Sequence, residues 1–106
     1  MFIEMKRFTV KRGNAEKIIE KFSGKGKAAT MEGFIDFSIM KRLRKDETEE
    51  VLIQIRWEDQ ESFTKWKRSD AHKAGHANRP KERPDFIVDV SVDMYEVETI
   101  KTAVTK

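Results

Sequence analysis

The chain has 106 residues, of which 39% are charged and 38% hydrophobic, with a formal net charge of +3 and a pI near 9.2. This length predicts one domain over residues 1–106, and the lack of cysteine excludes disulfides, thiolate nucleophiles and cysteine-ligated metal sites. No apolar run approaches the roughly 18 residues of a membrane span, and no signal-peptide pattern opens the chain. A cytoplasmic location without membrane contact is therefore expected.

Residues 2–10 are predicted to form a strand with apolar side chains on both faces. One face carries Phe2, Glu4, Lys6, Phe8 and Val10. After a turn at Gly13, Asn14 is a predicted N-cap, and apolar residues between 15 and 22 recur at helical spacing. A strand and an amphipathic helix therefore open the chain.

Two more strands are predicted at 34–42 and 51–57, and the polar run between them predicts a hairpin. In the first strand, Ile35, Phe37 and Ile39 alternate with Phe34, Asp36, Ser38 and Met40. The second strand is rich in β-branched side chains. The glycine-marked, lysine-rich connection that precedes them has no predicted structure.

Residues 57–76 hold both tryptophans and both histidines, and their pattern predicts two short helices with a bend between them. Asp59 is a predicted N-cap for the first helix, and Ser69-Asp70 is a second N-cap signal in mid-pattern. The second helix, from about Asp70 to His76, places His72 and His76 on one face. Their spacing suits zinc, although two ligands do not make a zinc site, and His72 is expected at the surface or at the rim of a cleft.

Residues 86–97 predict the fourth strand, with Val88, Val90, Val92 and Met94 on one face and Asp89, Ser91, Asp93 and Tyr95 on the other. The order strand, helix, strand, strand, helix, strand is typical of an α+β ferredoxin-like sandwich with its helices on one side of an antiparallel sheet. The first two strands carry apolar groups on both faces, so a homodimer with sheets packed face to face is expected. The tail from Glu98 onward is expected to fray or to reach such a partner.

The stretch from Trp57 to His76 resembles the signature of the IsdG-type haem-degrading monooxygenases, within the antibiotic biosynthesis monooxygenase superfamily. The matching residues are Trp57-Glu58, Phe63, Trp66, Ser69-Asp70, Gly75 and His76, supported by the turn Lys11-Arg12-Gly13 and the run Met31-Glu32-Gly33-Phe34. The resemblance implies a dimeric α/β barrel with one cleft per subunit between helices and sheet. It also implies that haem is both cofactor and substrate, and that O2 and an external reductant open the macrocycle and release iron.

The resemblance also implies roles for single residues. His76, near a helix C-terminus whose dipole strengthens an imidazole donor, is the implied proximal ligand of the haem iron. Trp66 is implied to press on the porphyrin, although packing in the helix core is its simpler interpretation, whereas Trp57 is structural. Arg79 and Arg83 are expected either to meet the haem propionates or to be solvated.

Lys6 departs from the family pattern, which has an asparagine on the first strand as the distal group. A lysine donates a hydrogen bond but adds a charge, and burying an unpaired charge is costly. Glu4, two residues away on the same face, is therefore a candidate partner for Lys6. The other interpretation is that Lys6 points to solvent and that no distal donor exists.

Three other functions stay open. One is a cofactor-independent monooxygenase of the same superfamily acting on a small aromatic or quinol, and another is a non-catalytic haem-binding protein. The third is an RNA-recognition module, but the strand at 51–57 lacks the aromatic residues on which such modules stack bases. The basic cluster at 41–45 is also followed directly by acidic residues. We therefore expect haem and an unidentified electron donor as partners, and no nucleic acid.

Overall fold

The computed structural model describes residues 1–24, 26–44, 46–77 and 83–104, excluding the side chains of 27 and 75–77. The elements are β1 (Phe2–Lys11), α1 (Ala15–Phe22), the 3-10 helix η1 (Lys27–Thr30), β2 (Phe34–Lys41), β3 (Thr48–Trp57), α2 (Gln60–Arg68), α3 (Asp70–Ala77) and β4 (Ile87–Glu96). The predicted order of strands and helices is confirmed, and η1 adds structure to the connection that had none assigned. Of the described helices, none is long and apolar enough to cross a membrane.

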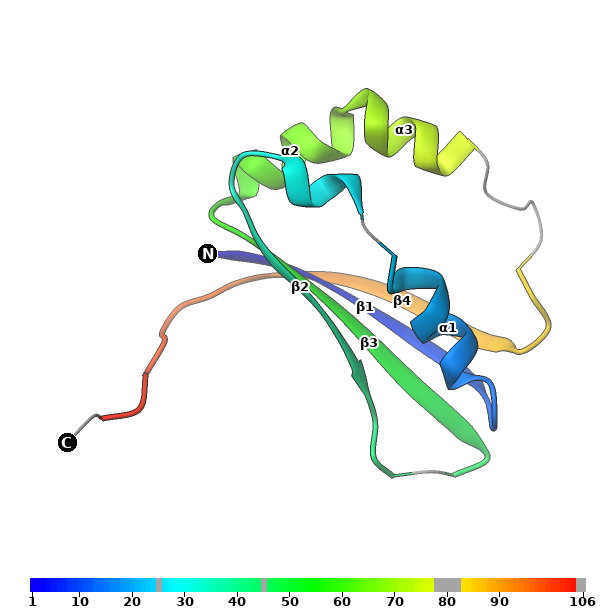
Figure 1. Cartoon of the computed structure of the whole chain (residues 1–106). Coiled ribbons are helices and arrows are strands. Elements are labelled where there is room, and N and C mark those ends of the chain that lie inside the picture. Colours follow the sequence, from blue (N-terminus) through cyan, green and yellow to red (C-terminus); the bar gives the residue numbers. More distant parts are fainter. Residues whose placement is uncertain (25, 45, 78–82, 105–106) are drawn as a thin grey trace.

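The four strands form one antiparallel sheet in the order β2-β3-β1-β4. The helices all lie on one side of this sheet (Figure 1). This arrangement confirms the ferredoxin-like fold and gives the sheet two unlike sides. We call the side under the helices the helix face and the opposite side the far face.

The core lies between the helix face and helices α1 and α2. Its buried side chains are Phe2, Phe8, Val10, Ala15, Ile18, Val51, Ile53, Ile55, Trp57 and Phe63. Alternate residues of β3 from 49 to 57 all point into this core, as the period of two in a strand requires. Trp57 is fully buried and meets Phe34 and Phe63 edge-on, at ring-centroid distances of 5.5 and 6.4 Å. Its predicted structural role is confirmed.

The register of β2 shifts between Phe34 and Asp36, and this shift overturns one predicted face. The extra residue, Ile35, lets Phe34 pair with Trp57 on the helix face while Asp36 pairs with Arg56 on the far face. Phe34 was predicted to share a face with Asp36, which is wrong because a bulge cannot be seen in simple alternation. The far face of β2 is consequently less apolar than predicted.

A second register shift affects β4. Thr9 pairs with Asp89 but Val10 pairs with Ile87, so Val88 has no partner on β1. Val90, Val92 and Met94 share the helix face as predicted, whereas Ile87 replaces Val88 there. Both shifts lie on the two edge strands of the sheet.

The start of α1 is capped from a distance. Asn14, the predicted N-cap, makes no capping bond, and its side-chain amide instead donates to the carbonyls of Lys11 and Arg12. The buried carboxylate of Glu49 on β3 accepts hydrogen bonds from the amides of Gly13 and Ala15, at 2.7 and 3.2 Å. Asn14 stands at the predicted N-cap position, but the carboxylate of Glu49, and not its own side chain, accepts from the amides at the start of α1.

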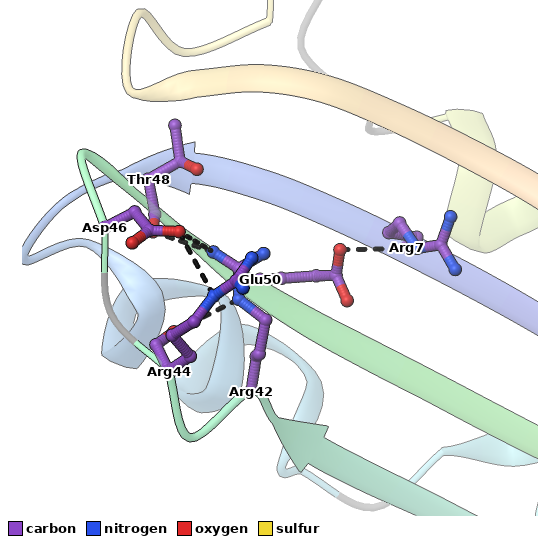
Figure 2. Close-up of polar contacts among 6 residues, drawn as sticks. All are labelled: Arg7, Arg42, Arg44, Asp46, Thr48 and Glu50. Atoms are coloured by element: carbon purple, nitrogen blue, oxygen red, sulfur yellow. Dashed lines mark hydrogen bonds and ion pairs between the residues drawn. The ribbon is translucent and has the colours of Figure 1, made fainter.

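Polar contacts close the β2–β3 hairpin, as Figure 2 shows. The Arg42 guanidinium donates to the carbonyls of Arg44 and Thr48, both at 3.1 Å, and Asp46 forms an ion pair with Arg44 at 3.3 Å. Nearby on the far face, Glu50 meets Arg7 at 3.4 Å. Arg42 and Arg44 therefore serve the turn itself, in line with the acidic residues that follow them in the sequence.

Candidate functional site

The helices leave part of the helix face uncovered. Glu4 and Lys6 on β1 lie directly opposite Met94 and Val92 on β4, and these four residues are called the open strip below. Val92 and Met94 are 46% and 47% exposed, although they share a face with the buried core. Helix α3 packs mainly on α2 and η1 rather than on the sheet, so it does not cover the strip.

Lys6 stands in the same row of β1 as Phe2 and Phe8, on the helix face, as the predicted alternation requires. It lies between Ile53 and Val92 on the neighbouring strands and is half-buried. Glu4 and Lys6 form no ion pair within the described part of the chain. Side chains two residues apart on a strand start about 7 Å apart, so neighbours on one face do not meet unless they bend together. The open strip thus holds two charged groups beside two apolar ones.

Trp66 lies in α2, half-buried, and packs against the hydrophobic core. Its indole also meets the imidazole of His72 edge-on, with ring centroids 5.2 Å apart and an interplanar angle of 78°. His72, which was expected to be exposed or at the rim of a cleft, is half-buried beside the tryptophan. Trp66 therefore combines core packing with a contact to α3.

Ser69 makes the bend between α2 and α3. Its amide and its hydroxyl both donate to the Trp66 carbonyl, at 3.0 and 2.6 Å. The same hydroxyl accepts a hydrogen bond from the His72 amide at 3.2 Å. The extended backbone of Ser69 (φ −70°, ψ 153°) ends one helix and caps the next, which confirms the predicted second N-cap.

The remaining predicted site residues lie at or beyond the end of α3. The backbone of His76 belongs to the last turn of α3, and its side chain lies outside the described residues. Arg79 also lies outside them, whereas Arg83 is described and exposed ahead of β4. Within the described part of the chain, no group of three or more histidine, aspartate and glutamate side chains can hold a metal ion.

Two carboxylates with shifted pKa values lie away from the open strip. On the far face, hydrogen bonds from the Arg56 guanidinium lower the pKa of Asp36 below its usual 3.8. At the start of α2, the Ser62 amide and hydroxyl lower the pKa of Asp59, whose Oδ1 accepts both at 2.8 Å. In both cases hydrogen bonds stabilise the charged form of a carboxylate that has a structural role. Asp59 is confirmed as the predicted N-cap.

The sequence matches the family model for antibiotic biosynthesis monooxygenase over residues 1–78. It is 41% identical over 102 residues to "Heme-degrading monooxygenase HmoA" of Bacillus subtilis, covering 95% of this chain and 94% of that protein. It is 32% identical over 102 residues to "Heme oxygenase (staphylobilin-producing)" of Staphylococcus haemolyticus, with 96% and 98% of the two chains covered.

Solved structures share the same fold. A crystal structure of an antibiotic biosynthesis monooxygenase from Bacillus cereus superposes with a TM-score of 0.85 at 39% identity, covering 96% of this chain and 97% of that one. The heme-degrader MhuD from Mycobacterium tuberculosis, solved with two hemes in its active site, gives a TM-score of 0.68 at 19% identity over 92% and 95% of the chains. The family match and the similarity over nearly the whole length agree with the ferredoxin-like sheet. The chain belongs to the antibiotic biosynthesis monooxygenase family.

Proposed function

We propose that this protein is a haem-degrading monooxygenase that binds haem over the open strip, on the side of the sheet where α3 lies. The observation that carries the proposal is the strip itself, where an uncovered apolar surface and a lysine stand on the side of the sheet that the helices should seal. An apolar surface of this kind marks a binding site more often than chance exposure. The names of relatives at 41% and 32% identity support haem as the ligand.

The donor set suits haem. Val92 and Met94 offer apolar contact to the flat face of a macrocycle, and the α3 backbone carries His76 as the proposed proximal ligand. Arg79 and Arg83, between α3 and β4, are the proposed partners of the propionates. Bound haem supplies the iron and the macrocycle that is opened, while O2 and an external electron donor are consumed.

The chain's own contribution is shape and charge. Lys6, opposite Val92 on the open strip, would bring a cation and a hydrogen-bond donor beside bound haem and could stabilise negative charge there. Trp66 is the proposed wall that distorts the macrocycle and selects the carbon attacked. In this proposal Trp66 and His76 have the roles that the family resemblance implies, and Lys6 takes the role of the distal asparagine.

A haemin titration followed by absorption tests the proposal. Wild-type protein should give one sharp Soret band that saturates at one haem per chain. His76→Ala should lose this band because the imidazole ligand is gone, whereas His72→Ala should keep it because His72 packs against Trp66. If both variants match wild type, His76 is not the ligand. If wild type gives no such band, haem is not the ligand of the strip, and the quinol-type monooxygenase takes its place.

Lys6 favours a second candidate function, a non-catalytic haem-binding protein. Lysine replaces the family's distal asparagine, and Lys6 has no ion pair in the described part of the chain to hold it in one position. A storage protein would bind haem as above and leave it intact when ascorbate is added with catalase present. Loss of the Soret band together with iron release separates the monooxygenase from this alternative.

We also propose that the protein works as a homodimer through its far face. Ile3, Met5 and Leu52 lie on this face together with Met40 and Tyr95, which are 39% and 52% exposed. After β4 the chain runs away from the domain (Figure 1), and the tail presents Ile100 and Val104 to solvent. Such apolar groups are better explained by a second copy than by a monomer.

A further inference from the structure

Three residues are linked where α2 meets α3. They are Trp66, Ser69 and His72. Ser69 ties the Trp66 carbonyl to the His72 amide through a single hydroxyl. The resulting bend carries His72 back over α2, where its imidazole meets the Trp66 indole edge-on at 5.2 Å. This geometry is the favourable one for two aromatic rings.

We infer that His72 is a positioning residue for Trp66, and that the bend at Ser69 holds the two rings in register. The indole packs on the core on one side and meets the imidazole on another. Without the imidazole, the half-buried indole loses a ring contact that helps to hold its orientation. The orientation of Trp66 is then set by the core alone.

The consequence for chemistry rests on the proposed function. If Trp66 is the wall that distorts bound haem, then its orientation decides which carbon of the macrocycle is attacked. His72 would act on the products without touching the haem iron. This assigns the two histidines of the chain different tasks, since His76 is the proposed ligand and His72 orients the tryptophan.

The positioning role can be tested without haem. Protein labelled with 5-fluorotryptophan should give two 19F resonances, one from Trp57 and one from Trp66, which Trp66→Phe identifies. In His72→Ala and in Ser69→Ala, the Trp66 resonance should move by more than its linewidth while that of Trp57 stays in place. In His72→Phe, which keeps a ring at this position, the Trp66 resonance should move back toward wild type.

Thr64→Val is the matched control. It removes a comparable hydrogen bond in α2, from the Thr64 hydroxyl to the Gln60 carbonyl at 3.0 Å, without touching the bend. Residues two apart on a helix do not face each other, so the Trp66 resonance should not move. If His72→Ala leaves the Trp66 resonance unchanged, or if Thr64→Val moves it equally, the inference is overturned.

A second arm uses the haem-loaded protein. His72→Ala should bind haem as wild type does but change the ratio of ring-opened isomers by about two- to ten-fold, the factor by which an aromatic pair of this kind biases an equilibrium. His72→Phe should restore the ratio. If the Trp66 resonance moves in His72→Ala but the ratio of ring-opened isomers does not change, His72 does not control the products. Failure of wild type to bind haem would instead overturn the proposed function and leave the 19F result standing.

Discussion

Glu49 is a buried charged residue whose carboxylate holds the start of α1. Glu49→Ala should lower the free energy of unfolding by about 2–3 kcal/mol, because two amides lose a charged acceptor. Glu49→Gln retains one acceptor oxygen and should cost about half as much. Urea denaturation monitored by circular dichroism measures both.

Asn14→Ala is the control for this assignment. The Asn14 side chain bonds only to exposed carbonyls ahead of the helix, so its loss should change the unfolding free energy by less than about 0.5 kcal/mol. A cost for Asn14→Ala equal to that of Glu49→Ala would contradict capping by Glu49.

Lys6 is the proposed hydrogen-bond donor to oxygen, and its replacement tests that role. A hydrogen bond to a charged group is worth roughly 1.5–3 kcal/mol, so Lys6→Ala should slow Soret loss with ascorbate and catalase by about ten-fold or more. Lys6→Asn, which introduces the residue type that the family resemblance implies at this position, should retain turnover because its amide still donates a hydrogen bond. Lys11→Ala, at the exposed end of the same strand, is the control. Equal rates in all four proteins would mean that Lys6 lies outside the site.

For single residues, the sequence motif from Trp57 to His76 allowed part of the candidate site to be predicted. The spacing of Trp66, Ser69 and Asp70 predicted two helices with a bend, because caps and helical periodicity are local signals. Glu49 was missed because it reaches α1 across 34 to 36 residues of chain, and only its parity with Val51 and Ile53 hinted that it points inward. The imidazole contact on Trp66 was missed because it depends on the angle between two helices.

Gly33 shows how elements are fitted to one another. Its φ of +86° is strained for any residue with a side chain, and a Cβ built on it would lie 2.1 Å from the Ser62 hydroxyl and 2.5 Å from the Ser62 Cβ in α2. Gly33→Ala should therefore lower the unfolding free energy by about 2–5 kcal/mol, the sum of backbone strain and overpacking. Thermal or urea unfolding measures the loss.

Gly13 supplies the matched comparison. Its φ of +89° is nearly the same, but a Cβ there would have no heavy atom within 4 Å. Gly13→Ala should cost only the backbone strain, about 1–2 kcal/mol. Equal losses for the two variants would show that the contact of Gly33 with Ser62 relaxes freely.

The strands and helices themselves were predictable, because alternation and helical spacing are strong over eight or more residues. The faces of the edge strands were less so. The extra residue Ile35 in β2 turned Phe34 toward Trp57 on the helix face. The extra residue Val88 in β4 left Ile87 as the partner of Val10. A bulge follows from pairing with the neighbouring strand, which the residues of one strand do not encode.

For the whole molecule, the testable claim is dimerisation through the far face. Sedimentation at micromolar concentration should report about twice the chain mass of 12.5 kDa. Met5→Asp places a carboxylate on the far face directly opposite Asp93 and should give a monomer, since an unpaired buried charge is costly. Leu43→Asp, at a 92% exposed position in the hairpin loop, should remain dimeric. A monomeric wild type would remove the barrel model.

The bulges on β2 and β4 also affect how the protein behaves when concentrated. An edge strand offers unpaired amides and carbonyls to any other strand, and regular edges invite open-ended growth into aggregates. Here each edge is interrupted by a residue out of register, Ile35 on one side and Val88 on the other. Addition of another strand is therefore hindered where each edge strand begins, while the regular pairing of the remainder of β2 and β4 leaves those edges to be covered by another segment or chain.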